Sequence, residues 1–221
     1  MQRVKKDLKK GLFITFEGGE GSGKTTQIRL LAAWLKKKDI PFLLTREPGG
    51  TPLADRIRSL LLDAKTKNLS PALELFLYAV ARRDHVSEVI LPALEDGKVV
   101  ICDRFSDATL AYQGWGRGLP VKTIQKINHS ATGGLKPNVT FLFDLPVQVG
   151  LGRAATRVRK LKKGTPLEDR FERESLNFHE RIRRGYLTLA RKGKRRFRII
   201  DAQRSPSEIF KQLCREMETI L

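Results

Sequence analysis

The sequence of 221 residues is short of several residue types, and each shortage excludes a class of protein. It has two cysteines, Cys102 and Cys214, so neither a disulfide framework nor a cysteine-rich metal cluster can be built. No apolar run is long enough to cross a membrane. Residues 1–10 are basic and lack the apolar core of a signal peptide, so we expect a cytoplasmic protein without a membrane partner.

Acidic residues are also in the minority, with 24 aspartates and glutamates against 43 lysines and arginines, for a formal net charge of +19. Such an excess favours anionic partners, which include both nucleotides and nucleic acids. Basic residues are densest at 3–10, 153–163 and 191–198, but aromatic residues do not alternate with them as they do in single-strand binders. We therefore expect a solvated basic surface and no specific nucleic-acid binding.

What the sequence does contain is a phosphate-binding loop, because residues 18–25 read GGEGSGKT. An apolar, β-prone run precedes it, and Ile28, Leu31 and Leu35 follow at the spacing of one helix face. In a strand–loop–helix unit of this kind, backbone N–H groups and the helix N-terminus point at a phosphate. The alternative is a glycine-rich turn with a chance Lys-Thr pair. The predicted ATP-binding residues are Gly18, Gly19, Glu20, Gly21, Ser22, Gly23, Lys24, Thr25 and Thr26.

Strand-like runs alternate with helix-patterned segments along the chain. The runs are 12–16, 42–45, 99–102, 139–143 and 197–200. This alternation predicts an α/β domain over residues 11–221, with a parallel five-stranded sheet covered by helices on both faces. Ligands of such sheets bind at the carboxyl ends of the strands, so functional residues should follow the strands.

Charged residues do follow the strands. Asp103 ends the third run, where a carboxylate can assist Mg²⁺ together with the Thr25 hydroxyl, or can simply cap a turn. Arg104 comes next and offers a planar donor fork for phosphoryl oxygens. Arg46 follows the second run, where it is either a phosphate clamp or half of a structural salt bridge. Lys24 of the loop is expected to reach the β- and γ-phosphates.

Two further segments have open readings. Residues 71–92 have the pattern of one helix, on which Tyr78 and Arg82 share a face. This pair can stack on a base and hydrogen-bond its carbonyl, or it can belong to the core and to a solvated face. Residues 106–118 are polar and glycine-rich, so we expect a loop that either binds ligand or is a surface excursion.

Taken together, the motifs of this chain resemble those of bacterial thymidylate kinases, which are P-loop nucleoside monophosphate kinases. The shared motifs are Phe-Glu-Gly before the P-loop, Thr-Arg-Glu-Pro-Gly-Gly-Thr at 45–51, Asp-Arg-Phe at 103–105, Ala-Tyr-Gln-Gly at 111–114 and Asp-Arg-Phe-Glu at 169–172. The resemblance implies a P-loop kinase fold, with a short lid at about 153–170. It also implies a homodimer.

The resemblance also assigns roles to residues. Arg46 and Arg104 would hold the dTMP phosphate, while Tyr78 would stack on thymine and Arg82 would donate to its O4. Thr109 would meet the base edge, and Tyr112 would lie against the sugar. Glu20 stands where some relatives carry a P-loop arginine, so a lid arginine would be catalytic, with Arg157 favoured over Arg153. The implied dTMP-binding residues are Arg46, Pro48, Tyr78, Arg82, Arg104, Thr109, Tyr112 and Gln113. The implied catalytic residues are Lys24, Asp103, Arg104, Arg153 and Arg157.

The resemblance therefore implies transfer of the γ-phosphoryl group of ATP to dTMP, giving dTDP and ADP in dTTP biosynthesis, with Mg²⁺ held by Thr25 and Asp103. Two alternatives stay open from the residues themselves. One is a kinase for another nucleoside monophosphate, which a substrate panel would identify. The other is a nucleic-acid-linked P-loop NTPase, which DNA or RNA would stimulate.

Overall fold

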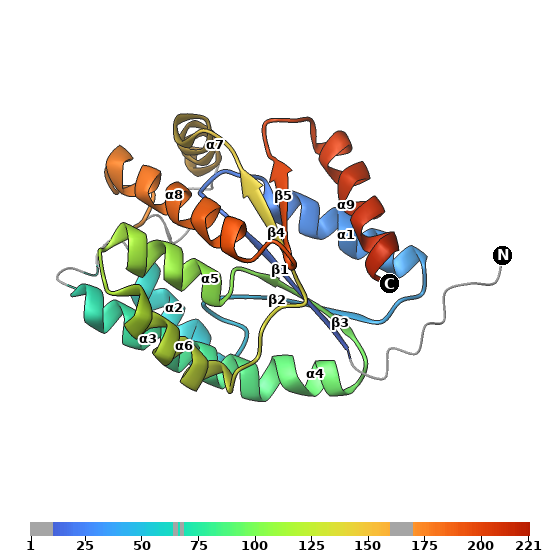
Figure 1. Ribbon diagram of the computed structural model, residues 1–221, viewed down its shortest axis with the longest axis horizontal. Helices are drawn as coiled ribbons and strands as arrows, with labels where there is room; N and C mark the ends of the chain where they lie inside the picture. The colour runs from blue at the N-terminus through green and yellow to red at the C-terminus, as the bar shows by residue number, and fades with distance from the viewer. Residues whose placement is uncertain (1–10, 64–65, 67–68, 160–169) are drawn as a thin grey trace.

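All five predicted strands form, and they assemble into one parallel sheet with the order β2-β3-β1-β4-β5. The computed structural model describes residues 11–63, 66, 69–159 and 170–221 (Figure 1). The strands are β1 (Leu12–Gly18), β2 (Phe42–Arg46), β3 (Val99–Asp103), β4 (Val139–Asp144) and β5 (Phe197–Asp201). Each strand ends one or two residues later than the apolar pattern predicts, because the polar residue that follows the pattern still belongs to the ladder.

The register brings the functional ends of the central strands to one edge of the sheet. Arg46 pairs with Asp103 across β2 and β3, and Asp103 pairs with Phe16 across β3 and β1. The P-loop leaves β1 at the same edge, since Gly18 pairs with Phe143 of β4. Arg46, Asp103 and the start of the P-loop therefore lie at one edge of the sheet, as predicted for residues that follow parallel strands.

Helices cover both faces of the sheet, as predicted for an α/β domain (Figure 1). The α-helices are α1 (Lys24–Lys37), α2 (Pro52–Leu62), α3 (Pro71–His85), α4 (Leu91–Glu95), α5 (Ser106–Thr109), α6 (Val121–Thr132), α7 (Val147–Arg159), α8 (Leu176–Lys192) and α9 (Pro206–Ile220). Two π-helical segments, η1 (Val86–Ile90) and η2 (Leu110–Gly116), continue α3 and α5.

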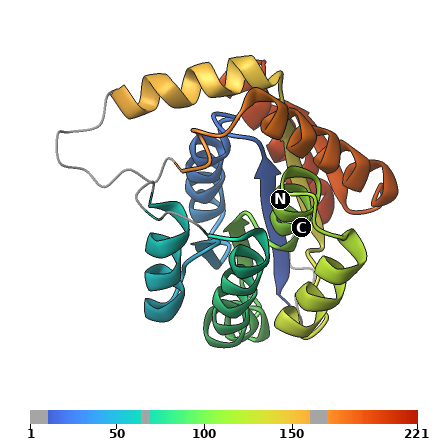
Figure 2. The same cartoon turned by 90° about the vertical axis from the view of Figure 1, so that its left-hand side faces the viewer.

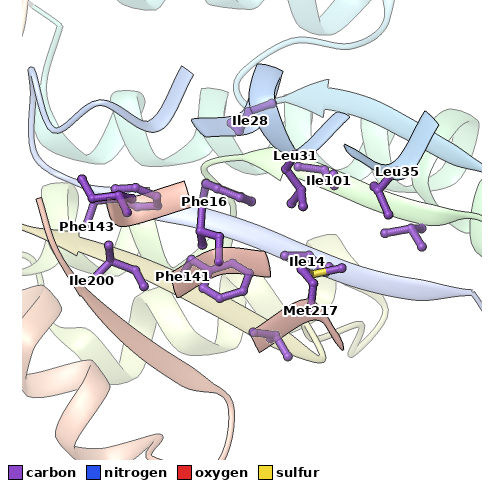
Figure 3. Close-up of a cluster of buried hydrophobic side chains, with 14 of the residues drawn as sticks. Ile14, Phe16, Ile28, Leu31, Leu35, Ile101, Phe141, Phe143, Ile200 and Met217 are labelled. Carbon is purple, nitrogen blue, oxygen red and sulfur yellow. The ribbon is translucent and has the colours of Figure 1, made fainter. Parts of the chain in front are cut away.

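Alternate residues of each strand serve the two faces. Ile14 and Phe16 of β1 lie in the cluster with Leu31 and Leu35 of α1 and Met217 of α9 (Figure 3). Phe13, the residue before Ile14, faces the other side of the sheet and packs with η1 and α4. Because the period of a strand is two, this pattern buries both faces of β1, as expected for a parallel sheet covered on both sides. This core holds β1 rigidly in place, and with it the P-loop that begins at the carboxyl end of β1.

Two of the predicted segments differ from expectation. The predicted helix at 71–92 is α3 followed by η1 and α4, so it continues through a π-helical turn to Glu95. The expectation of a loop at 106–118 is wrong, since residues 106–116 are helical and mostly buried. Its glycines serve close packing: a Cβ on Gly116 would lie 2.7 Å from the Phe178 ring of α8. Here glycine marks an approach between helices, and not a flexible loop.

The predicted N-terminal tail, residues 1–10, and residues 160–169 of the predicted lid lie outside the described residues. Residues 153–159 of that lid belong to α7. Among the helices that the structure describes, none is both long and apolar enough to cross a bilayer.

Candidate active site

A cavity of about 630 Å³ lies at the carboxyl edge of the sheet, between the P-loop, α3, η2 and α7. In Figure 2, α7 lies at the top of the view, with α2 and α3 at the bottom. The volume of this cavity suits nucleotide-sized ligands. Most of the residues that line the cavity are predicted site residues, namely Glu20, Gly21, Ser22, Gly23, Lys24, Thr25, Thr26, Arg46, Pro48, Tyr78, Arg82, Asp103, Arg104, Thr109, Tyr112, Gln113, Arg153 and Arg157. The first two glycines of the loop, Gly18 and Gly19, line a separate small cavity.

The P-loop has the shape of an anion cradle. Gly21 and Gly23 have φ of 64° and 86°, which the left-handed region permits readily only for glycine. A Cβ on Gly21 would lie 2.0 Å from the Gly150 carbonyl oxygen, so the loop also needs glycine there for space. The helix that follows, α1, has no side-chain cap and no acidic residue in its first turn, so its N-terminus is available to a phosphate.

Lys24 is buried and curls back over the loop. Its Nζ donates to the carbonyl oxygens of Gly18 and Gly19, each at 3.0 Å, and to Ser22 Oγ at 3.1 Å. Burial, followed by the nearby Arg104 cation, lowers the pKa of Lys24 to about 8. A phosphate bound in the cradle would add negative charge beside this ammonium group and favour its charged form.

Thr25 and Asp103 form the oxygen pair predicted to hold Mg²⁺. Thr25 Oγ1 lies 3.5 Å from Asp103 Oδ2 across the cavity floor. Asp103 Oδ1 is buried, and it has no hydrogen-bond partner among the described residues. A buried carboxylate oxygen without a partner is costly unless a ligand satisfies it. Hydroxyl and carboxylate oxygens are the donors that Mg²⁺ prefers, so these residues fit the ion.

Arg104 is held above the P-loop by the side chain of Glu20. Arg104 Nη2 donates to Glu20 Oε1 at 2.8 Å, and Tyr112 donates its hydroxyl to the same oxygen at 2.7 Å. Burial alone would raise the pKa of Glu20, but the cations Arg104 and Lys24 outweigh it and lower the pKa to about 2. The Glu20 side chain therefore faces the predicted dTMP residues, and any contact of Glu20 with ATP falls to its backbone.

Glu17 lies directly beneath this group. It accepts hydrogen bonds from the Phe105 backbone N–H at 2.7 Å and from the Tyr186 hydroxyl at 2.8 Å. Burial, reinforced by the charge of Asp107, raises the pKa of Glu17 to about 8. Arg104 Nη1 also donates to the Tyr186 hydroxyl oxygen at 3.4 Å. Tyr186 therefore links Glu17 to Arg104 by hydrogen bonds.

The Arg-Glu-Pro-Gly-Gly motif forms the second wall. Arg46 pairs with Asp55 at 3.2 Å, so the salt bridge is observed. Arg46 also lines the cavity, and its role as a phosphate clamp stays a prediction. The Glu47–Pro48 peptide bond is cis, and the Pro48 carbonyl accepts from Arg58 Nη1 at 2.9 Å. Arg46 retains an exposed guanidinium that can reach an anion.

Arg82 is 2% exposed, so it does not belong to a solvated face. Its Nε donates to Glu47 Oε2 at 2.7 Å and its Nη1 to Asn128 Oδ1 at 2.8 Å. His85 contacts the other Glu47 oxygen through Nδ1 at 3.2 Å. Arg82 nevertheless lines the cavity together with Tyr78, which packs partly against the core. The predicted base-binding pair thus shares one wall, and Glu47 and Asn128 fix the direction of the guanidinium.

Two polar groups of α5 and η2 complete this wall. Thr109 is buried, lines the cavity, and leaves Oγ1 without a hydrogen-bond partner among the described residues. Gln113 also lines the cavity but donates its Nε2 to Glu74 at 2.7 Å. Thr109 can therefore take a hydrogen bond from a ligand, while the Gln113 amide nitrogen is already engaged.

The two arginines of α7 have different surroundings. Arg153 donates Nη1 to the Ala202 carbonyl at 2.9 Å, which ties α7 to the loop after β5. Arg157 pairs with Glu172, and its side chain is 60% exposed at the cavity rim. Arg157 is therefore the arginine with greater freedom to reach a ligand.

Sequence reasoning missed the carboxylates that hold the predicted residues in place. Glu17 and Glu47 stand inside the quoted motifs but were given no role, and Glu74 was not singled out. A signal existed for Glu74, since it is an isolated carboxylate among apolar residues in a helix pattern. Phe171, also unassigned, lines the cavity and packs edge-on against Tyr112 at 5.3 Å.

Comparisons with known proteins agree on one family. The sequence profile described as "Thymidylate kinase" matches residues 16–213. The chain is 56% identical over 191 residues to a thymidylate kinase of Geotalea daltonii, covering 86% of this chain and 89% of that one. It is 50% identical over 210 residues to a thymidylate kinase of Desulfovibrio desulfuricans, covering 95% and 96%. The crystal structure of thymidylate kinase from Ehrlichia chaffeensis superposes with a TM-score of 0.73 at 32% identity, covering 95% of this chain and 99% of that one.

Proposed function

The chain belongs to the thymidylate kinase family, and from that premise we propose that it transfers the γ-phosphoryl group of ATP to dTMP through the cavity described above. The observation that carries the proposal is that the P-loop lines the same cavity as Arg46, Tyr78 and Arg82. We assign the P-loop side of this cavity to the donor and the side of those three residues to the acceptor. Phosphoryl transfer needs two nucleotides in line and little covalent chemistry from the protein.

In the acceptor half, Arg46 and Arg104 bind the phosphate of dTMP, and Tyr78 packs on the thymine ring. Arg82 donates to the O4 carbonyl, and Thr109 meets the base edge. Tyr112 lies against the sugar, between Glu20 and Phe171. Cytosine offers an amino group where thymine has O4, so it would leave the Arg82 donors without an acceptor.

In the donor half, Lys24 binds the β- and γ-phosphates, and the α1 N-terminus and loop amides surround them. Thr25 and Asp103 would hold Mg²⁺, which neutralises phosphate charge when bound. Arg157 adds positive charge at the transferring group, because Glu20 leaves the loop without an arginine of its own. Arg153 orders the loop after β5 through its bond to Ala202.

A coupled assay for ADP formation tests the proposal. Wild-type protein should phosphorylate dTMP in a Mg²⁺-dependent manner. The monophosphates dUMP, dCMP and dGMP are tested separately as alternative substrates. Lys24→Ala should lower kcat by about 10²–10³, since loss of one charge-stabilising contact removes a few kcal/mol. Folded wild-type protein without dTMP-dependent ADP formation would contradict the proposal. ATPase activity that rises with DNA or RNA would favour the nucleic-acid-linked alternative.

We further propose that the protein is a homodimer that associates through an apolar face of α2 and α3. Phe76 and Val80 lie one turn apart on α3 and are 56% and 51% exposed, and Leu53 of α2 and Ile127 of α6 line the same shallow groove. Contiguous apolar surface of this kind is typical of an interface. Phe76→Glu together with Val80→Glu should yield monomer in sedimentation analysis. Leu44→Glu on β2, an edge strand of the sheet, serves as the matched control.

A further inference from the structure

Glu74 is a carboxylate in the first turn of α3 with 0% exposure. It accepts from Gln113 Nε2 at 2.7 Å and from Arg117 Nε at 3.3 Å, and it pairs with Arg170. Arg117 is itself balanced by Glu174 at 2.6 Å. The two carboxylates thus balance two guanidinium groups, so the buried cluster carries no net charge. Such clusters persist only when their geometry is well satisfied.

This cluster joins three parts of the chain that the kinase reaction uses. Gln113 belongs to η2, which also carries Tyr112 on the acceptor side of the cavity. Glu74 precedes Tyr78 by one turn of α3. Arg170 begins the described segment 170–174, and its Nε donates to the Leu61 carbonyl at the end of α2 at 2.6 Å. Arg170 therefore fixes that segment to α2 and α3.

The next two residues of the segment contact residues that the proposed function assigns to the two substrates. Phe171 packs edge-on against Tyr112 and lines the cavity. Glu172 pairs with Arg157 of α7, the arginine at the cavity rim. Three consecutive residues of the segment therefore contact, in order, the buried Glu74, Tyr112 and Arg157. Tyr112 is assigned to the sugar of the acceptor, and Arg157 to the transferring phosphate.

We propose that Glu74 is a positioning residue that couples binding of the acceptor nucleotide to the position of Arg157. An acceptor seated against Tyr78 and Tyr112 holds α3 and η2 in the arrangement in which Glu74 faces Arg170. That arrangement places residues 170–172, and with them the partner of Arg157. Because coupling between two sites is reciprocal, the acceptor should then tighten binding of the donor by the same factor. The inference rests on the proposed kinase function.

The competing explanation is that Glu74 contributes only to stability. Removal of a buried carboxylate leaves guanidinium groups without their partner, which destabilises a protein whatever its activity. Loss of stability alone would therefore be uninformative. The coupling between the two substrates is the quantity that a purely structural role leaves unchanged.

The experiment measures the Kd of a non-hydrolysable ATP analogue by calorimetry, with and without saturating dTMP. In the wild type, dTMP should lower this Kd by at least about fivefold, the lower end of ordinary coupling. Glu74→Gln, which has the same shape but no charge, should bind the analogue alone within about threefold of the wild type. Its coupling should fall below about twofold, and its kcat should fall by about tenfold, since Arg157 acts in the transition state.

Arg170→Gln tests the same junction from its other end and guards against failure of Glu74→Gln to fold. If Glu74 acts through Arg170, the double variant should be no worse in coupling than either single variant. Arg198→Gln removes an ion pair of 3.0 Å between β5 and α9, away from the cavity, and is the control for loss of a charge pair. Its coupling should match that of the wild type.

Two results would overturn the inference. One is a wild type in which dTMP leaves the Kd of the analogue unchanged. The other is a folded Glu74→Gln or Arg170→Gln protein that retains the wild-type coupling. Failure of the proposed function is distinguishable from both, because it would appear as absence of dTMP-dependent ADP formation by the wild type.

Discussion

Glu20 of the P-loop holds Arg104 of the Asp-Arg motif at 2.8 Å, and the same carboxylate oxygen receives the Tyr112 hydroxyl. A phosphate-binding loop thus places a negative charge on the acceptor side of its own site. That charge cannot serve the phosphates of ATP, which it would repel. Its effect is to fix the direction of a guanidinium and a phenol, both of which line the acceptor half.

Glu20→Gln should therefore impair the acceptor more than the donor. Without the carboxylate, Arg104 and Tyr112 lose a charged hydrogen-bond acceptor, a loss of about 1.5–3 kcal/mol. We expect kcat/KM for dTMP to fall by about 10–100-fold while the Kd of ATP changes by less than about threefold. Steady-state kinetics and calorimetry of the same preparation check both values. A variant whose ATP affinity falls as steeply as its dTMP efficiency would contradict this role of Glu20.

Base selection is expected to depend on Arg82, which has both a structural and a binding contact. Arg82→Gln should lower kcat/KM for dTMP and narrow the gap to dCMP, because the donors aimed at O4 are lost. It should also destabilise the protein by about 3–5 kcal/mol, since Glu47 keeps a buried charge with one partner fewer.

The two effects can be separated with a second substitution. The double variant Arg82→Gln with Glu47→Gln removes both charges of the pair and should recover much of the thermal stability. It should not recover discrimination between dTMP and dCMP. If the double variant regains discrimination, Arg82 acts through the fold and does not read the base.

The sequence predicts well the parts of this protein that depend on local pattern. The strands and the P-loop follow from apolar periodicity and glycine spacing, and the meeting of Arg46, Asp103 and Gly18 follows from the rule that parallel strands end at one edge. The helical course of residues 106–116 does not follow, because its glycines are explained only by residues of other elements, such as the Phe178 ring of α8 that approaches Gly116.

The supporting carboxylates are the other part that pattern does not predict. Glu17, Glu47 and Glu74 are buried, and each is satisfied by residues distant in the sequence; the Glu74–Arg170 pair spans 96 positions. Nothing local distinguishes such a glutamate from a solvated one, apart from its apolar neighbours. Arg82 illustrates the same limit, since helical spacing alone places it equally well on a solvated face.

The two arginines of α7 should separate in kinetics. Arg157→Ala should lower kcat by about 10²-fold or more while the Kd of ATP changes a few-fold, as expected for a group that acts in the transition state. Arg153→Ala should raise the KM for ATP and lower kcat by less than about tenfold, because its contact is with the Ala202 carbonyl. Measurement at saturating dTMP compares them directly. Wild-type kcat in both variants would leave these arginines as surface charge.

Glu17 provides a test of pH dependence that does not involve catalysis. Its pKa is raised from 4.5 to about 8 in the folded protein, mainly by burial, so the folded state binds more protons than the unfolded state between these two pH values. Unfolding then releases a proton, and the stability contributed by Glu17 falls as pH rises through this window, by up to about 1.4 kcal/mol per pH unit. Below pH 4.5 the residue is neutral in both states and adds no slope.

Glu17→Gln keeps the shape of the side chain and cannot ionise. The free energy of unfolding of this variant, measured in urea from pH 5 to pH 9, should therefore decline less with pH than that of the wild type. The difference between the two proteins should grow in favour of the variant until about pH 8 and then level off. Glu208→Gln at the start of α9, where the carboxyl group is exposed, is the control and should follow the wild-type slope over this range. Parallel pH profiles of wild type and Glu17→Gln would show that Glu17 is ionised throughout, held so by Arg104 and the Tyr186 hydroxyl.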